Sequence, residues 1–351
     1  MSLQETLKKI HPPNRSFEAE AQQRLDLLTK PQGSLGKLEE LARRIACIQG
    51  EIPPRLGHKL IFVFAADHGI AGEGVSAYPS KVTAQMTYNF LNGGAAINVL
   101  TRHFGVAVKV VDIGVAHDFP PMQELRSLKI RNGTANFARG PAMTQAEALR
   151  AIETGIHLAE EAASKNLFLL AAGDMGIGNT CSAAAIFCAL TGISAREVTG
   201  RGTGIDSATW ERKVSVIEMA LALNRPDPSD PIDVLAKIGG LEIGAMTGLI
   251  LGAAAQRVPF VLDGYIATAA ALLAKRLHPA VGDFLLAAHL SAESGHQAML
   301  QELGVKPILH LEMRLGEGTG ACIAMGLIEA AVKLMREMAT FESAAVARKI
   351  R

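Results

Sequence analysis

Short apolar runs alternate with longer amphipathic segments over most of this 351-residue chain. Each run is hydrophobic throughout, which is typical of strands that helices cover on both faces. Strands separated by helices predict a parallel, doubly wound α/β sheet with right-handed crossovers. From about residue 179 to 256 the pattern is helical only. The six predicted strands are Lys59–Ala65, Ala107–Ile113, Leu167–Ala172, Val258–Leu262, Phe284–Ala288 and Pro307–Leu311.

Helical patterns occupy both ends of the chain. Two amphipathic segments, Ser16–Leu28 and Gly36–Ile48, are separated by a turn that contains proline and glycine. A long helical pattern follows the last predicted strand and continues to about Arg351, where no strand is left to cover. We therefore expect the two ends to pack together. The predicted division is a small helical domain of residues 1–52 and 325–351 and a large α/β domain of residues 53–324.

Charge and composition narrow the function classes. The formal net charge is +1 and no run of Lys and Arg occurs, so we expect neither nucleic acid nor an anionic membrane surface as a partner. The most apolar segment, Ile243–Ala255, is too short to span a bilayer. Residues 1–14 lack the apolar core of a signal peptide. These features predict a soluble cytoplasmic protein.

The cysteines and histidines show no spacing typical of a metal site. Cys47, Cys181, Cys188 and Cys322 lie in helical patterns without a CxxC pair. No two of the ten histidines have the spacing of an HExxH motif. We expect four buried, reduced thiols and no metal ion.

Polar residues and glycines follow five of the six predicted strands. In an open parallel sheet, ligands bind beyond the carboxyl ends of the strands, so these segments are the candidates for a functional site. The segments are Ala66–Gly69, Gly173–Thr180, Asp263–Tyr265, His289 with Ser291 and Glu293, and Arg314–Gly320.

The segment Arg314–Gly320 places an acid in a glycine-rich turn before a predicted helix. Free N–H groups at a helix N-terminus favour an anion, yet Glu317 would repel a phosphate. If Glu317 faces a pocket, it is better suited to take up a proton beside the anion, with Arg314 as the compensating charge. Alternatively, Glu317 only occupies the first helical turn, where an acid interacts favourably with the macrodipole. Local chemistry supports both interpretations.

The segment Gly173–Thr180 resembles a monophosphate site, because its glycines expose N–H groups and Asn179 and Thr180 add side-chain donors. The alternative is a tight turn that Asn179 caps. Lys213, considered alone on its helix, is typical of a solvated surface charge. His68, directly after an acid in a turn, is more typical of a residue that satisfies backbone groups than of a base.

The glycine pairs do not match the dinucleotide fingerprint GxGxxG. Cys181 and Ser207 occupy the place of the third glycine after two of the pairs, and the third pair has Glu317 where a pyrophosphate would pass. The P-loop pattern GxxxxGK[ST] does not occur. An NAD-dependent oxidoreductase is therefore disfavoured, and a P-loop protein is excluded.

Seven distinctive blocks extend over essentially the whole length. They are Lys30–Gly36 (KPQGSLG), Ala66–Gly69 (ADHG), Tyr78–Met86 (YPSKVTAQM), Gly93–Asn98 (GGAAIN), Gly173–Thr180 (GDMGIGNT), Leu262–Gly264 (LDG) and Met313–Gly320 (MRLGEGTG). In this order and spacing they closely resemble the nicotinate-nucleotide–dimethylbenzimidazole phosphoribosyltransferases, which make the lower-ligand nucleotide of cobalamin.

The resemblance implies a six-stranded parallel Rossmann-like domain with helices on both faces, and a small helical domain formed by both chain ends. It implies a homodimer in which the partner's small domain helps to close each active site. Glu317 matches the catalytic carboxylate. The implied phosphate and ribose contacts are Gly176, Asn179, Thr180, Lys213, Arg314 and Gly316. The implied acceptor-base contacts are Tyr78, Met86, Asp174 and Leu315.

The implied reaction moves the phosphoribosyl group of nicotinate mononucleotide to 5,6-dimethylbenzimidazole, with inversion at C1′ and Glu317 as general base. The products are α-ribazole 5′-phosphate and nicotinate, and no cofactor is expected. The chain has Tyr78 and Met86 where some members have Ser and Gln, and Asp174 where Glu is common. These departures affect acceptor preference. Alternatives are the same transfer to adenine, another benzimidazole or a phenol, or a nucleotide-binding protein without catalysis.

Overall fold

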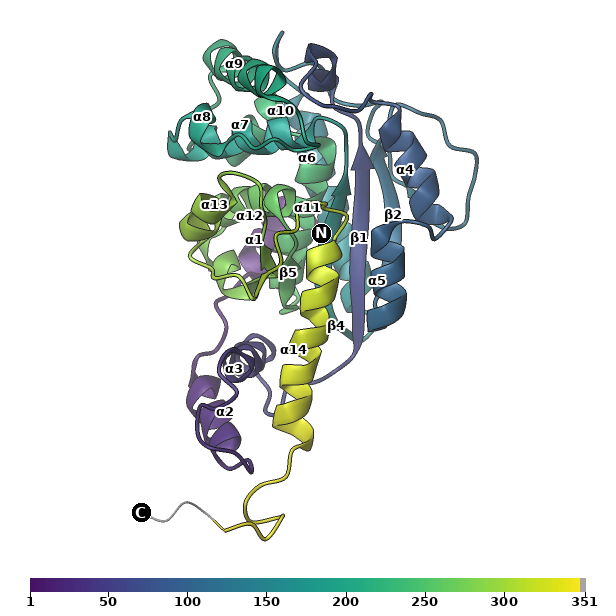
Figure 1. Cartoon of the computed structure of the whole chain (residues 1–351). Helices are drawn as coiled ribbons and strands as arrows, with labels where there is room; N and C mark the ends of the chain where they lie inside the picture. The colour runs from purple at the N-terminus through teal and green to yellow at the C-terminus, as the bar shows by residue number, and fades with distance from the viewer. Residues whose placement is uncertain (348–351) are drawn as a thin grey trace.

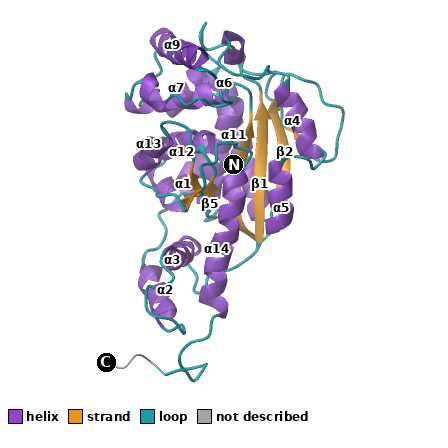
Figure 2. Ribbon diagram, viewed as in Figure 1, coloured by secondary structure: helices purple, strands orange, loops and turns teal. Residues whose placement is uncertain are grey.

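Six parallel strands form the central sheet of the computed structural model, which describes residues 1–347 (Figure 1). The strand order is β3-β2-β1-β4-β5-β6, and helices lie on both faces (Figure 2). The predicted α/β class and six-stranded parallel sheet are therefore confirmed. The strands are β1 His58–Ala66, β2 Ala107–Gly114, β3 Leu125–Ser127, β4 Leu167–Met175, β5 Phe260–Leu262 and β6 Leu285–Ala287.

One of the six predicted strands was wrong, because it does not belong to the main sheet. Pro307–Leu311 contributes only β8 (Leu309–His310), which pairs with β7 (His289–Leu290) in a separate two-stranded sheet. The sixth strand of the main sheet is β3, at the edge beside β2. Pro307 has no N–H group for a sheet ladder, so the strand within the run Pro307–Leu311 is short. The edge strand β3 has one buried apolar side chain, Leu125, so no hydrophobic run marks it.

The buried strand β1 explains why its run is continuously apolar. Leu60, Phe62 and Phe64 face the helices of one side, while Ile61 and Val63 face those of the other side, because successive strand residues point to opposite faces. The first face is covered by α6 (Gln145–Ala163), α11 (Leu241–Ala255) and α12 (Tyr265–Leu277). The second face is covered by α4 (Val82–Leu91), α5 (Ala96–Phe104) and α14 (Thr319–Glu337).

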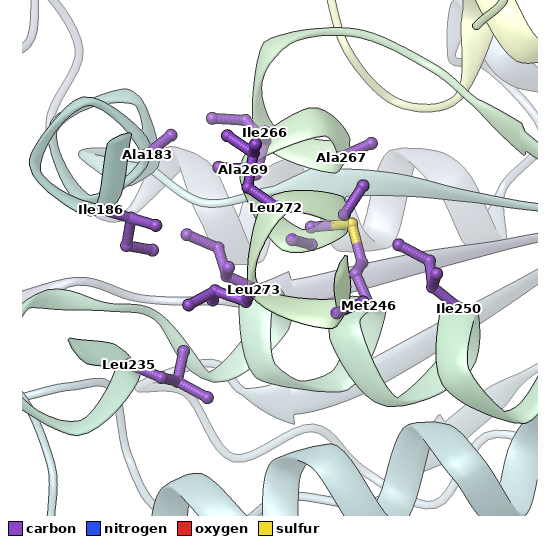
Figure 3. Close-up of a cluster of buried hydrophobic side chains, with 14 of the residues drawn as sticks. Ala183, Ile186, Leu235, Met246, Ile250, Ile266, Ala267, Ala269, Leu272 and Leu273 are labelled. Carbon is purple, nitrogen blue, oxygen red and sulfur yellow. The ribbon is translucent and has the colours of Figure 1, made fainter. Parts of the chain in front are cut away.

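Glycines let α6 and α11 approach closely, because a Cβ atom at Gly248 would lie 1.7 Å from the Ile152 carbonyl oxygen. Figure 3 shows Met246 and Ile250 of α11 beside Leu272 and Leu273 of α12, with Ala183 opposite.

The helix-only interval predicted for residues 179–256 is confirmed. It contains α7 Asn179–Thr191, α8 Ala195–Val198, α9 Ser207–Asn224, α10 Pro231–Ile238 and α11. Short elements elsewhere are η1 Gly69–Glu73, η2 Pro279–Phe284 and α13 His296–Leu303.

The helices of the two chain ends lie side by side (Figure 1). α3 (Lys37–Gln49) packs against both α2 (Ser16–Asp26) and α14. The segments that follow α2 and α14 are also hydrogen-bonded to each other. The Thr29 N–H donates to the Ala339 carbonyl, and the Phe341 N–H donates to the Leu27 carbonyl. The first helix, α1 (Leu3–Lys9), packs instead on α6 and α11. The division into two domains stays a proposal.

The predicted end of the last helix was wrong. α14 ends at Glu337, and Thr340 and Ser343 then form a hydrogen-bonded turn that competes with further helix. Residues 348–351 of the predicted helix lie outside the described residues.

All four cysteines are buried free thiols, as predicted. None of the helices within residues 1–347 combines the length and apolar character that crossing a bilayer requires.

Candidate active site

A cavity of about 580 Å³ opens at the carboxyl ends of β4 and β5, where the strand rule places a site. The cavity is lined by segments that follow β4, β5 and β7, by the start of α4 and by the turn before α14. Ten of the eleven residues predicted from the sequence line it. They are Tyr78, Met86, Asp174, Gly176, Asn179, Thr180, Arg314, Leu315, Gly316 and Glu317.

Glu317 is held in an uncommon backbone conformation. Gly316, Glu317 and Gly318 all have positive φ angles, of 84°, 63° and 87°. A residue with a Cβ in this left-handed region costs about 1–2 kcal/mol, so the surrounding contacts must hold it there. Gly173 of β4 permits one such contact, because a Cβ atom at that position would overlap the carbonyl group of Glu317.

Glu317 lines the cavity and is 5% exposed, and so is buried. Its Oε2 accepts a 3.4 Å hydrogen bond from the N–H of Ile97, at the N-terminus of α5. Burial raises the pKa of Glu317, the Ile97 N–H opposes this rise, and the Asp263 carboxylate adds to it. The alternative that Glu317 occupies the first helical turn was wrong, since Gly318 is the N-cap of α14 and Glu317 precedes it. The macrodipole of its own helix therefore does not explain this acid.

Asp174 is a second buried carboxyl group at the same wall. Its Oδ2 accepts a 2.7 Å hydrogen bond from the Asn179 side chain. Burial and, secondarily, the Asp263 carboxylate raise the pKa of Asp174 to about 8, while the bond from Asn179 acts in the opposite direction. At neutral pH the Asp174 carboxyl therefore holds a proton and is a hydrogen-bond donor.

Lys213 lies behind the cavity wall. It is 1% exposed, so the interpretation as a solvated surface charge was wrong. Its Nζ donates to Thr180 Oγ1 at 2.9 Å and to the Gly200 carbonyl at 3.2 Å. Burial lowers the pKa of Lys213. The ammonium group thus orients Thr180 and brings a positive charge to the N-terminus of α7, where backbone N–H groups already favour an anion.

Arg314 connects two loops at the same end of the cavity. Its Nη1 donates a 2.9 Å hydrogen bond to the Gly202 carbonyl, and the side chain is otherwise exposed. Arg314, the Gly176–Thr180 turn and buried Lys213 together make this end suitable for a phosphate. Met86, Tyr78 and Leu315 add apolar lining, and the last two side chains are 54% and 57% exposed.

His68 lies outside this cavity. Its Nδ1 is 3.1 Å from Ser182 Oγ and its Nε2 is 2.6 Å from Glu242 Oε1, in the protein interior. The side chain therefore bonds to other side chains, and the interpretation that it satisfies backbone groups was wrong. It packs under the phosphate end, because a Cβ atom at Gly176 would lie 3.2 Å from His68 Nε2.

Comparison with known proteins identifies the family. A family model described as Phosphoribosyltransferase matches residues 10–346. The nicotinate-nucleotide–dimethylbenzimidazole phosphoribosyltransferase of Geobacter sp. (strain M21) is 57% identical over 344 residues, which cover 98% of this chain and 99% of the relative. The chain belongs to this phosphoribosyltransferase family. The enzyme of the same name from Roseiflexus sp. (strain RS-1) is 54% identical and covers 99% of each chain.

A solved structure agrees with this assignment. The phosphoribosyltransferase chain is 48% identical to CobT from Thermus thermophilus, with a TM-score of 0.91. The match covers 95% of the present chain and 100% of that chain. The fold and the enzyme class therefore follow from both sequence and structure.

Several cavity residues of the phosphoribosyltransferase were not among the predicted contacts. Gly264, Tyr265, His289 and Ser291 belong to segments that follow strands, so the strand-end rule already indicated them as a group. The loop with Gly202 and Thr203 follows a helix, α8, so that rule did not indicate it. The remaining ones are Val75, Ser76, Val82, Met175, Ile177, Gly178 and Ile266.

The buried Asp174 predicts a pH dependence of stability. The carboxyl has a pKa of about 8 in the fold and about 3.9 when unfolded. Its contribution to stability is therefore fully present below about pH 4 and is lost as the pH rises through about 8. We expect Asp174→Asn to flatten the decline of the unfolding temperature between about pH 5 and pH 9. The exposed control Asp227→Asn should leave the decline unchanged. Parallel curves for Asp174→Asn and wild type would contradict the ionisation argument.

Proposed function

We propose that this phosphoribosyltransferase transfers the phosphoribosyl group of nicotinate mononucleotide to 5,6-dimethylbenzimidazole. The products would be nicotinate and α-ribazole 5′-phosphate, the lower-ligand nucleotide of cobalamin. The observation that carries the proposal is a buried acid, Glu317, in a cavity that is also lined by Arg314, by the Gly176–Thr180 turn and by apolar side chains such as Met86. The names of the Geobacter and Roseiflexus relatives support the two substrates.

The donor needs no general acid. Its ring is attached to C1′ through a positively charged pyridinium nitrogen, which takes the bonding electron pair and leaves uncharged. This differs from glycoside hydrolysis, where a carboxylic acid protonates the leaving group. One carboxylate beside the sugar is therefore sufficient.

The acceptor needs a base. One nitrogen of the benzimidazole attacks C1′ as the pyridinium bond breaks, and the other nitrogen carries a proton that must be removed. In the proposal, Glu317 accepts this proton, and attack from the opposite face inverts C1′. General base catalysis of this kind supplies roughly 10²–10⁴-fold. The raised pKa of Glu317 suits the role, because a stronger base takes up the proton more readily.

The basic end of the cavity supports the position proposed for the phosphate. The N–H groups of the Gly176–Thr180 turn, Arg314 and the charge of Lys213 would hold the phosphate. Met86, Tyr78 and Leu315 would pack on the flat acceptor ring, and the protonated Asp174 would offer a hydrogen bond. Holding both reactants about C1′ adds several kcal/mol.

Product analysis tests the proposal directly. Purified enzyme should convert nicotinate mononucleotide and dimethylbenzimidazole to nicotinate and a nucleotide that co-elutes with authentic α-ribazole 5′-phosphate. Adenine, other benzimidazoles and a phenol in parallel reactions measure acceptor preference, which Tyr78, Met86 and Asp174 affect. Nicotinate release with another acceptor but not with dimethylbenzimidazole would support the alternative substrate class. No release with any acceptor would support a binding protein.

Arg314→Ala should weaken nicotinate mononucleotide binding by roughly 1–3 kcal/mol, because a charge-assisted phosphate contact is lost. Calorimetry with the nucleotide alone measures the change. Arg196→Ala is the matched control, since Arg196 pairs with Glu211 at 2.6 Å and does not line this cavity. Equal affinity of Arg314→Ala and the control would remove Arg314 from the phosphate site.

The homodimer stays a proposal that rests on the family resemblance. Leu315 and Tyr78 at the cavity mouth and the nearby Leu311 are large apolar side chains that are more than one third exposed. A partner chain that covers them would also close the cavity. Light scattering on the purified protein measures the oligomeric state.

A further inference from the structure

Asp263 is a buried carboxyl group that lies beneath the Glu317 turn and outside the cavity lining. It directly follows β5 and is 1% exposed. Its Oδ2 accepts a 3.1 Å hydrogen bond from the N–H of Gly318, and its Oδ1 accepts a 2.9 Å bond from the N–H of Ala321. Gly318 has no side chain to cap α14, so β5 supplies the cap from 55 residues away.

The position of this cap matters because of the residue before it. Glu317 has a positive φ angle between two glycines that also have positive φ angles. Such a conformation persists where neighbouring contacts determine it. The turn is held from one side by the close approach of Gly173 on β4 and from the other by the two hydrogen bonds to Asp263.

We propose that Asp263 is a positioning residue for phosphoribosyl transfer, which caps α14 from the end of β5 and thereby holds the Glu317 carboxylate in the cavity. The inference rests on the proposed role of Glu317 as general base. Asp263 itself touches neither the cavity nor a reacting atom. It acts only through the backbone of the turn and through its charge.

The charge of Asp263 has a separate effect on the base. The Glu317 carboxylate accepts a hydrogen bond from the Ile97 N–H of α5, and the Asp263 carboxylate after β5 raises its pKa. Both Asp263 and Glu317 also raise the pKa of Asp174 at the end of β4. Asp263 in turn faces His289 of β7, which lowers the pKa of Asp263 against the rise caused by burial. Because Asp263 raises the pKa of Glu317, its removal should leave a weaker base that loses its proton at lower pH.

Asp263→Asn separates positioning from a role in folding alone. The amide keeps the shape, but its oxygen can accept from only one of the Gly318 and Ala321 N–H groups, and its NH2 donor then faces the other. We expect kcat to fall by about 10²-fold, as for a small displacement of a catalytic group. The dissociation constant for nicotinate mononucleotide should stay within about threefold, and the acid limb of the kcat–pH profile should move to lower pH. A role in folding alone would lower the unfolding temperature without moving that limb.

Two further variants complete the test. Gly318→Ala keeps the carboxylate but strains the turn, because its Cβ would lie 2.8 Å from Ile61 Cγ2 at a φ of +87°. We expect a similar fall of kcat with the acid limb in its wild-type place. Asp230→Asn is the matched control, since Asp230 also caps a helix, α10, with bonds to Ile232 and Asp233 away from the cavity. It should leave kcat and the pH profile unchanged.

The outcomes distinguish this inference from the proposed function. Suppose that the wild-type enzyme makes the nucleotide and Glu317→Gln does not. If Asp263→Asn then has the wild-type kcat and the wild-type acid limb, the inference about Asp263 is overturned and the proposed function is not. If Asp263→Asn does not fold, full turnover by Gly318→Ala overturns it, and a fall of kcat there supports it. Full turnover by Glu317→Gln would instead remove the proposed general base, and the positioning role with it.

Discussion

Glu317→Gln should lower kcat by at least about 10²-fold while the enzyme still binds nicotinate mononucleotide. The amide has the shape of the carboxylate and can keep the hydrogen bond from Ile97, so the turn should stay in place. It cannot accept the proton that the acceptor nitrogen must lose. Nicotinate release under saturating substrates measures kcat, and calorimetry with the nucleotide measures binding.

A control for this variant lies five residues earlier. Glu312→Gln makes the same chemical change at an exposed position of the same segment, outside the cavity lining. It should have wild-type kcat. Turnover by Glu317→Gln within about threefold of that control would show that another group takes the proton.

Gly173→Ala should reduce turnover by about 10²-fold, with a smaller loss of nucleotide affinity. The added Cβ would overlap the carbonyl group of Glu317, so either β4 or the turn must move. Because rigid backbone lies on both sides, the shift displaces the carboxylate from the acceptor. Steady-state kcat for both substrates, compared with calorimetry, measures the two effects.

The matched control for Gly173→Ala is Gly282→Ala in η2. A Cβ atom there meets only ordinary contacts, the nearest being 3.9 Å away on Lys275. This variant should have wild-type kcat and affinity. If Gly173→Ala also does, the close approach of β4 does not position the Glu317 turn.

The losses of turnover expected for Glu317→Gln and Gly173→Ala both concern the Glu317 turn. The proposed base, Glu317, is buried at a cavity, in a backbone conformation that a short turn cannot maintain alone. The conformation depends on β4, at Gly173, and on β5, through Asp263. Changes at Glu317, Gly173 and Asp263 should therefore alter turnover more than nucleotide binding, for which Arg314 and the Gly176–Thr180 turn are the proposed contacts.

Element types could be predicted from local patterns. The strands β1, β2 and β4 are buried on both faces, so nearly every position is apolar and the run is unmistakable. The strand-end rule indicated the place of the site, because it depends on chain direction and not on detailed packing. It also indicated the segments with Asp263 and His289, without assigning either a role.

Local patterns failed where pairing partners are distant. Leu125–Ser127 is a strand because it pairs with the edge of β2, whereas Pro307–Leu311 pairs only through Leu309–His310, with β7. Lys213 has the sequence context of a surface residue, yet α9 packs so that its ammonium group reaches Thr180 on α7. The last helix ends early because the following residues pair with the segment after α2.

By itself the sequence determined the α/β class, most strands, and the segments with Glu317 and Gly176–Thr180 that line the cavity. Hydrophobic periodicity encodes these features, since it records which faces of each element avoid water. Only the tertiary structure decided that Glu317 is buried, that Asp174 holds a proton near neutral pH, and that Asp263 caps α14. Burial, charge proximity and long-range hydrogen bonds depend on segments that are brought together by packing, and no local pattern contains them.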